Sequence, residues 1–246
     1  MYFCRVKILR AVYSVYLLFF FCLWFFLLFP FLLIPIIDKK RFKWIGVINR
    51  LWARLLFAFV FIPVKVVYEE KLDKSKSYIL CPNHFSYLDI PTIGLVNINA
   101  IFVGKSALEK IPLFGWMYKK LHITVNRDSL KSKYNTMIRG MEAIDEGKSL
   151  VIFPEGGITS KKLPHLARFK DGAFRLAIEK QVPIVPVTVY NNWKILSDDL
   201  LLNNYPIEVH FHKPIPTQGL SLKETNDLKV KVFNIIESSL NKRFIK

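Results

Sequence analysis

The sequence predicts an α/β fold, in which a mixed sheet flanked by helices is preceded by an N-terminal hydrophobic helical membrane anchor. Three observations lead to this prediction. A long run without charged residues occupies the first part of the chain. Beyond Val67, short apolar or β-branched runs alternate with helical segments, which is typical of an α/β sandwich. Two polar motifs directly follow predicted strands, where the functional loops of such folds gather.

Composition limits the classes of function. The 246 residues suffice for one compact domain with an attachment segment, and this core needs no disulfide bonds. None of the cysteines, Cys4, Cys22 and Cys81, belongs to a CxxC pair, so we expect neither a disulfide framework nor a metal site. The net charge of +17 suits anionic lipid, nucleic acid or an acidic protein. Because the basic residues are spread out and no nucleic-acid-binding motif occurs, we expect no nucleic-acid partner.

The apolar run extends from Ala11 to Ile37 and reads AVYSVYLLFFFCLWFFLLFPFLLIPII. As one helix it would be about 40 Å long, more than the roughly 30 Å of a bilayer core. It could be a tilted helix that spans the membrane. It could also stop near Pro30, because a proline ring removes a backbone donor and clashes with the preceding turn. The run is too long for a signal peptide.

The flanking charges give no orientation to a single span. Basic residues precede and follow the run in similar numbers: Arg5, Lys7 and Arg10, then Lys39, Lys40, Arg41 and Lys43. Such balance suits a segment whose two ends stay on the same face of the membrane. A second apolar stretch, Leu55 to Val64, is too short to span and looks interfacial. We therefore predict that residues 1–70 form a two-helix hairpin in one leaflet and that residues 71–246 form the α/β domain.

Strands and helices alternate through the predicted domain. Predicted strands occupy residues 78–81, 101–103, 123–125, 150–153, 184–190 and 207–211. Predicted helices occupy residues 88–95, 113–121, 132–146, 171–180 and 222–240. Gly147 is a usual residue to end the third helix, and Asp171 is placed to cap the fourth.

The first motif is NHFSYLD, residues 83–89, directly after a predicted strand and Pro82. In a regular helix, residues five apart point about 140° away from each other. His84 and Asp89 can therefore meet only if a loop becomes a helix between them, with Ser86 as a candidate N-cap. A carboxylate on one imidazole nitrogen fixes the tautomer and leaves the other nitrogen as a base. The alternative is a solvated histidine beside a helix-capping aspartate.

The second motif is FPEGG, residues 153–157, at the end of another predicted strand. Gly156 and Gly157 allow the backbone to approach a ligand closely, and exposed amides there can hold an oxyanion or a phosphate. Lys105 and Arg127 each follow a strand-like run, and cations at that edge suit a phosphate headgroup. The alternatives are an ordinary turn and two solvated surface charges.

Together these motifs resemble a known family. NHFSYLD, then GK with a later PLFG and VNR, then FPEGG, then VPIVPV are similar to the four blocks of the glycerophospholipid acyltransferases. The pattern most resembles the bacterial 1-acyl-sn-glycerol-3-phosphate acyltransferases, also called lysophosphatidic acid acyltransferases. The resemblance covers roughly residues 77–189, and the apolar N-terminal segment fits the membrane anchor of that family.

The resemblance implies a reaction and a site. It implies transfer of a fatty acyl group from acyl-CoA or acidic acyl-carrier protein to the free hydroxyl of the lysophospholipid 1-acyl-glycerol-3-phosphate, which gives phosphatidic acid. No cofactor is implied, and the domain is expected at the cytoplasmic membrane, facing the cytoplasm. His84 is implied as the base and Asp89 as its partner. The implied substrate-binding residues are Lys105, Arg127, Glu155, Gly156 and Gly157.

One departure from the family leaves the acceptor headgroup open. The family usually continues FPEG with Thr-Arg, whereas this chain has Gly157-Ile158. Cations that could replace the missing arginine are Lys161, Lys162, Arg168 and Lys170, and their spacing does not choose between them. Another lysolipid, such as a lyso-aminolipid, is an alternative acceptor.

Two further readings differ in mechanism or class. Cys81 or Ser86 lies near His84 in sequence and could be a nucleophile in covalent catalysis. A non-catalytic adaptor that binds anionic lipid through its basic surface would explain the anchor and the charge. It would leave the two motifs without a role.

Overall fold

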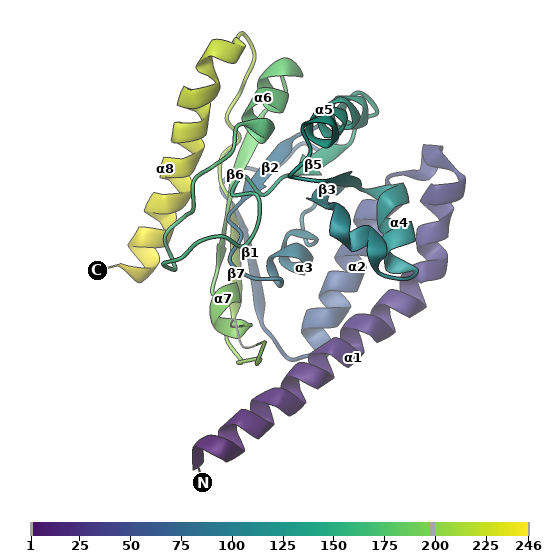
Figure 1. Ribbon diagram of the computed structural model, residues 1–246, viewed down its shortest axis with the longest axis vertical. Helices are drawn as coiled ribbons and strands as arrows, with labels where there is room; N and C mark the ends of the chain where they lie inside the picture. Colours follow the sequence, from purple (N-terminus) through teal and green to yellow (C-terminus); the bar gives the residue numbers. More distant parts are fainter. Residues whose placement is uncertain (1, 197–199, 246) are drawn as a thin grey trace.

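The computed structural model describes residues 2–196 and 200–245, and within them seven strands form one sheet in the order β1-β7-β6-β2-β5-β3-β4 (Figure 1). The strands are β1 (Val64–Tyr68), β2 (Ile79–Pro82), β3 (Ala100–Lys105), β4 (Ile123–Val125), β5 (Ser149–Val151), β6 (Ile184–Tyr190) and β7 (Ile207–Phe211). β6, β2, β5, β3 and β4 are neighbours and run parallel. β7 is antiparallel to β6 and parallel to β1. The carboxyl ends of five strands therefore meet at one edge.

Helices cover both faces of this sheet, which confirms the predicted mixed α/β fold (Figure 1). The helices are α1 (Tyr2–Ile37), α2 (Trp44–Phe59), α3 (Asp89–Ile93), α4 (Phe114–Leu121), α5 (Leu130–Asp145), α6 (Gly172–Glu179), α7 (Asn192–Ile195) and α8 (Thr225–Phe244). Short 3₁₀ helices are η1 (Lys39–Arg41), η2 (Ser106–Lys110) and η3 (Leu222–Glu224).

The strand side chains alternate between two hydrophobic clusters, because successive residues of a strand point to opposite faces. Ile79 and Cys81 of β2 pack in the cluster that holds Phe174 of α6, together with residues of α5 and α8. Leu80 lies between them in sequence and packs in the other cluster, with Ile93 of α3. These side chains are fully buried, and each contributes about 1.5–3 kcal/mol of hydrophobic free energy. The central strands are therefore held from both sides.

Helix α1 runs without interruption through Pro30, which decides between the two alternatives in favour of one continuous helix. Its 36 residues give a length of about 54 Å. Packing on both sides of the proline holds the helix: the ring of Phe29 lies 6.4 Å from that of Trp116, and Leu32 is buried. Tertiary contacts therefore outweigh the backbone hydrogen bond that Pro30 cannot make.

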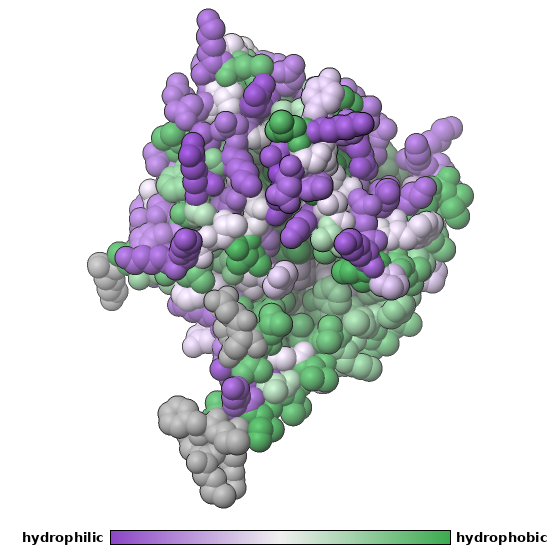
Figure 2. Space-filling model, in the orientation of Figure 1, coloured by the Kyte–Doolittle hydropathy of each residue, from purple (hydrophilic) through white to green (hydrophobic). Residues whose placement is uncertain are grey.

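Helices α1 and α2 form an antiparallel pair joined by η1 (Figure 1). The ring of Phe21 meets Trp52 edge-on at 4.8 Å, and the rings of Phe20 and Phe59 lie 5.3 Å apart. Val6–Ile37 is, within the described residues, the one helix long and apolar enough to cross a membrane. Its outer side forms a continuous hydrophobic surface in Figure 2. The pair has the form of the predicted hairpin, whose place in one leaflet stays a prediction.

The sheet begins earlier than the sequence predicted. Strand β1, Val64–Tyr68, lies inside residues 1–70, which were assigned to the anchor, and it pairs with β7. The apolar run that ends at Val64 continues into this strand, so no break in composition marked the boundary. Helix α7 was also missed, because four residues are too short for a helical period. Cys22 is exposed and Cys81 buried, both as free thiols, while the side chain of Cys4 lies outside the described residues.

Candidate active site

His84 and Asp89 lie in contact at the carboxyl end of β2. Nδ1 of His84 is 3.0 Å from Oδ2 of Asp89, and both side chains are buried. Residues 83–88 form an irregular loop and α3 begins at Asp89, so the loop-to-helix transition brings the two side chains together. This contact fixes the imidazole so that Nε2 is the nitrogen that can accept a proton.

The Asp89 carboxylate also organises the loop around His84. Its Oδ2 accepts hydrogen bonds from the backbone amides of Phe85 at 2.7 Å and Ser86 at 2.8 Å. The sequence suggested Ser86 as the N-cap of this helix, but the cap position is Leu88, and it makes no side-chain cap hydrogen bond. The prediction of that cap is wrong, because the aspartate side chain itself accepts the free amides before the helix.

Asn192, at the start of α7, holds the other oxygen of Asp89. Its Nδ2 donates to Oδ1 of Asp89 at 2.9 Å and to Oγ1 of Thr92 at 2.9 Å. Asn192 follows β6, which is the neighbour of β2 in the sheet. The sequence analysis missed this residue, because an uncharged asparagine 103 positions away gives no signal without the strand order.

Two further residues hold the His84 loop; both belong to the two motifs, but the sequence did not indicate their roles. The ring of Phe153, after β5, stacks on the imidazole with centroids 4.0 Å apart and planes inclined by 24°. The side chain of Asn83 makes two hydrogen bonds to the backbone of Val189 in β6, donating to its carbonyl and accepting from its amide. The histidine therefore lies between the loops that follow β5 and β6, with one face covered.

Glu155 holds the loop of residues 83–88 through a hydrogen bond to its backbone. Its Oε1 accepts a hydrogen bond from the backbone amide of His84 at 2.8 Å, and its Oε2 accepts one from Ala167 at 2.9 Å. The residue is only 2% exposed. Burial raises the pKa of Glu155 to about 7, although the two amides act in the opposite direction. In this geometry both oxygens of Glu155 hold backbone amides, and the expectation that Glu155 also binds substrate stays a prediction.

The two glycines of FPEGG form a turn that cations approach closely. Gly156 has φ +78° and Gly157 has φ +152°, which favour glycine. A Cβ atom at Gly156 would lie 2.6 Å from Nζ of Lys170, and one at Gly157 would lie 3.1 Å from Nη1 of Arg127. The Gly156 amide donates to the carbonyl of Phe153 at 3.0 Å, so this turn already uses it.

Three cations occupy this edge of the sheet. Lys105 ends β3 and is exposed, and its register partner in β4 is Val125, two residues before Arg127. Arg127 is half-buried, and burial lowers the pKa of its guanidinium below the usual value. Of the four cations proposed to replace the missing arginine, Lys170 contacts the glycine turn. Lys161, Lys162 and Arg168 are exposed elsewhere on the loop before α6.

The two candidate nucleophiles are unsuited to covalent catalysis. Cys81 is fully buried, and burial raises the pKa of its thiol, which disfavours the thiolate. Ser86 is buried, and its Oγ accepts a hydrogen bond from the Leu88 amide at 3.3 Å within the turn. We therefore assign both residues to packing and loop structure.

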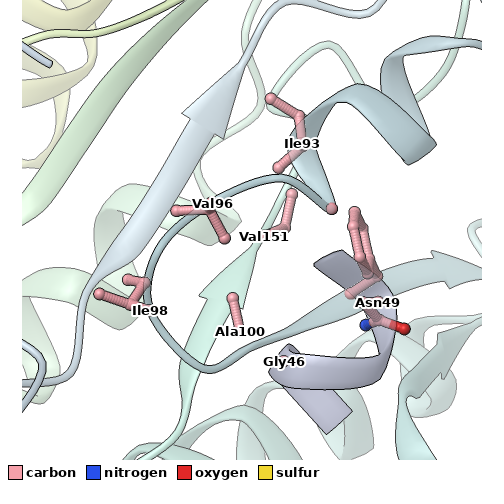
Figure 3. A pocket seen from close by; sticks show the side chains of 9 residues that line it. Gly46, Asn49, Ile93, Val96, Ile98, Ala100 and Val151 are labelled. Atoms are coloured by element: carbon pink, nitrogen blue, oxygen red, sulfur yellow. The ribbon is translucent and has the colours of Figure 1, made fainter. Parts of the chain in front are cut away.

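Two hollows lie near the site. An open cleft of about 420 Å³ begins beside the dyad at Phe85 and is lined by Leu163, Trp193, Lys194, Leu196, Asn203 and Tyr205. A second cavity lies under α2, where Gly46 and Asn49 face Ile93, Val96 and Ile98 (Figure 3). Its volume of about 10 Å³ is enough for roughly one water molecule. The cleft is the larger of the two, and it reaches Phe85, the residue after His84.

Metal ligands were not expected from the sequence. Among the residues that the structure describes, no group of three or more His, Cys, Asp or Glu side chains is placed to hold a metal ion. The expectation that the reaction needs no metal or cofactor stays a prediction.

Comparison with known proteins decides the family. A family model described as Acyltransferase matches residues 63–190, just over half of the chain. The chain belongs to the acyltransferase family. This acyltransferase places its two matched motifs, NHFSYLD and FPEGG, within hydrogen-bonding distance of each other through Glu155 and His84.

Curated relatives carry a common name. A chloroplastic 1-acyl-sn-glycerol-3-phosphate acyltransferase of Brassica napus is 32% identical over 184 residues, which are 73% of this chain and 53% of that protein. A 1-acyl-sn-glycerol-3-phosphate acyltransferase of Saccharomyces cerevisiae is 32% identical over 77% of this chain and 63% of its own length. One of Haemophilus influenzae is 28% identical and covers 80% and 81%. The acyltransferase thus spans about half to two thirds of the first two relatives.

A solved structure shares the fold. The crystal structure of the 1-acyl-sn-glycerophosphate (LPA) acyltransferase PlsC from Thermotoga maritima superposes with a TM-score of 0.81 and covers 98% of each chain at 21% sequence identity. At this identity the likeness establishes the fold, including the N-terminal helices, and leaves the substrate to be tested.

We expect Asn192→Ala to lower kcat about tenfold, because removal of a hydrogen bond to a buried charged group costs about 1.5–3 kcal/mol. Asp89 would keep its contact with His84 but lose the donor on Oδ1. Steady-state kinetics would measure the change. Asn241→Ala on α8, remote from the dyad, is the matched control. A wild-type kcat in folded Asn192→Ala protein would contradict this positioning role.

Glu155 predicts a pH-dependent stability. Its folded-state pKa of about 7 lies above its usual value of 4.5, so the native state binds more protons between these values. The free energy of unfolding should therefore fall as pH rises through this window. Relative to Glu155→Gln, wild type should lose up to about 3 kcal/mol. Urea unfolding in detergent at pH 4.5 and 7.5 measures this, and a pH-independent difference between the two proteins would contradict it.

Proposed function

We propose that this acyltransferase transfers a fatty acyl group from a thioester to the free hydroxyl of 1-acyl-glycerol-3-phosphate, forming phosphatidic acid. One observation supports this most directly. A buried His84–Asp89 pair lies beside a glycine turn that Arg127 and Lys170 approach. The names of the curated relatives support the same acceptor.

In the proposed mechanism, Nε2 of His84 removes the proton from the acceptor hydroxyl as its oxygen attacks the thioester carbonyl carbon. The Asp89 carboxylate stabilises the imidazolium that forms. Collapse of the tetrahedral intermediate breaks the carbon–sulfur bond, and the leaving thiolate takes the proton from His84. The new ester and the free thiol then leave, and the histidine is again neutral.

The oxyanion needs a hydrogen-bond donor close to His84. The sequence suggested the amides of Gly156 and Gly157. Since the Gly156 amide donates to Phe153 within the turn, we propose the Gly157 amide, the next along the loop. The positive φ of Gly156 turns the chain at this point, and Arg127 beside Gly157 adds positive charge near the developing oxyanion.

Arg127 and Lys170 are proposed as the phosphate site. They approach adjacent residues of one turn from different elements, so a phosphate at the turn would contact both. Lys170 takes the place of the arginine that follows FPEG in the family. Lys105, at the end of the neighbouring strand, is close enough in register to add a third charge. This arrangement favours a phosphate acceptor over a lyso-aminolipid.

We propose that α1 lies in one leaflet, parallel to the membrane surface. The helix contacts the rest of the protein along its length, from Tyr13, whose hydroxyl donates to the Val60 carbonyl at 2.5 Å, to Phe29, which packs on Trp116. These contacts extend over about 24 Å of helix. A spanning helix would have lipid around this stretch, which would draw the α/β domain into the bilayer.

The proposed orientation of the catalytic domain rests on where the two candidate acyl donors occur. Acyl-CoA and acyl-carrier protein are both made in the cytoplasm, so we propose that the catalytic domain faces it. Both donors are anionic and suit the charge of +17. A purely adaptor role would not use the buried dyad, which makes an enzyme the better explanation.

His84→Ala should lower transfer by about 10²–10⁴-fold, because a positioned base contributes that much. Cys81→Ala and Ser86→Ala serve as controls and should keep substantial activity, since the Ser86 amide still donates to Asp89. Thiol release with lysophosphatidic acid and acyl-CoA or acyl-carrier protein measures turnover. Near-normal turnover in folded His84→Ala protein would reject the mechanism, and loss of activity in either control would favour covalent catalysis.

Arg127→Ala and Lys170→Ala should each raise the KM for lysophosphatidic acid about tenfold or more, since a charge-assisted hydrogen bond is worth about 1.5–3 kcal/mol. Lys162→Ala removes an exposed cation from the same loop and should change little. The same kinetics with a lyso-aminolipid of equal chain length test the headgroup. A preference for the aminolipid, with KM unchanged in both variants, would reject the proposed acceptor but leave acyl transfer intact.

A further inference from the structure

Three large apolar side chains are exposed between η2 and the first turn of α4. Ile111 is 47% exposed, Leu113 41% and Trp116 46%. They lie close together in sequence, in a segment of the chain that follows the α1–α2 hairpin. Clustered exposure of large apolar side chains marks a surface that contacts another molecule or a membrane.

The backbone presents these side chains in a strained turn. The Phe114 amide donates to the Pro112 carbonyl at 2.6 Å across Leu113, which has φ +62° and ψ −54°. A γ-turn of this hand is rare and costly for a residue other than glycine. Gly115 then allows a close approach, because a Cβ atom there would lie 2.3 Å from the Glu109 carbonyl oxygen. The segment is therefore a fixed projection rather than a loose loop.

This projection continues the apolar surface of α1. The ring of Phe114 lies 5.7 Å from that of Phe25, and Trp116 packs on Phe29. Phe26 and Leu27, adjoining on α1, are 59% and 53% exposed. In Figure 2 the hydrophobic surface along α1 meets the hydrophilic surface at the level of α4.

Basic residues border the projection. Lys110, Lys119 and Lys120 are exposed on either side of it, and of these Lys119 pairs with Glu109 at 3.2 Å. Apolar side chains flanked by lysines match the interface of a membrane that carries anionic lipid. The continuity with α1 places any such contact at the same surface.

We propose that residues 111–116 insert into the leaflet that holds α1 and form a second contact with anionic lipid. This proposal rests on the proposed attachment of α1. The proposed lipid contact would also affect the candidate active site, because α4 connects residues 111–116 to the cations there. Tyr118 stacks on Phe114, and its hydroxyl lies where a Cβ atom of Gly104 would be, next to Lys105. Insertion therefore holds the phosphate site at the level of the lipid headgroups.

Nitroxide labels on the full chain test the proposal. Phe26→Cys, Ile111→Cys and Leu222→Cys are each made in a Cys4→Ser, Cys22→Ser background and bound to phosphatidylcholine–phosphatidylglycerol vesicles. Leu222, in η3, has a comparable exposure of 44% and is the matched control. We expect labels at 26 and 111 to be severalfold more accessible to oxygen than to a water-soluble nickel complex, and the label at 222 to be the reverse.

Each other outcome overturns the proposal in a different way. A label immersed at 26 but aqueous at 111 would reject the second contact and leave the attachment of α1 standing. Aqueous labels at both positions would reject both. A label at 111 shielded from oxygen and nickel alike would indicate contact with a second copy of the chain in place of lipid.

Kinetics give an independent readout. The double variant Ile111→Ser, Leu113→Ser should raise the KM for vesicle-embedded lysolipid about tenfold or more, because the exposed parts of two aliphatic side chains would no longer be buried in lipid. Activity on acceptor dispersed in detergent should stay within about twofold, because the dyad is untouched. Leu222→Ser, Val230→Ser is the control with equal loss of exposed apolar surface. An unchanged KM on vesicles would contradict the proposal.

Discussion

The Asp89 carboxylate is the constraint on which the arrangement of the site depends. A fully buried carboxylate needs several donors to replace its lost hydration, and Asp89 receives them from His84, Phe85, Ser86 and Asn192. Three of these donors follow β2 and one follows β6. Because these two strands are parallel neighbours in the sheet, their carboxyl ends bring all four donors to one carboxylate. The geometry of the dyad therefore depends on the topology of the sheet.

The sequence predicted those parts of the site and fold that local pattern determines. His84 and Asp89 share one motif, and the buried parallel strands read as short apolar runs, so both were found. Asn192 and the stacking of Phe153 on His84 could not be predicted, because these contacts with the dyad depend on which strands adjoin β2. The effect of Pro30 stayed open for a related reason: packing by residues distant in sequence keeps the helix intact.

The cations illustrate the same division between local and long-range information. Sequence spacing named Lys170 as one of four substitutes for a missing arginine, with no means of ranking them. The fold ranks them, because the amide of Lys170 donates to the Pro154 carbonyl at 2.8 Å and so brings its side chain over the glycine turn. In the proposed phosphate site, the charge missing after FPEG is supplied by Lys170 from another segment of the chain that the loop contacts. This keeps the electrostatics similar while the motif changes.

The lengthwise contact of α1 with the body of the protein has a consequence for the bilayer as a whole. With the proposed attachment and the proposed reaction, the enzyme reaches one lipid layer only, and every two-chain product molecule is added to that layer. The charged headgroup of the product makes spontaneous movement across the hydrocarbon region costly. Balanced growth of the two layers would then require a separate catalyst of transbilayer lipid movement. Without it, newly made lipid would accumulate in one layer only.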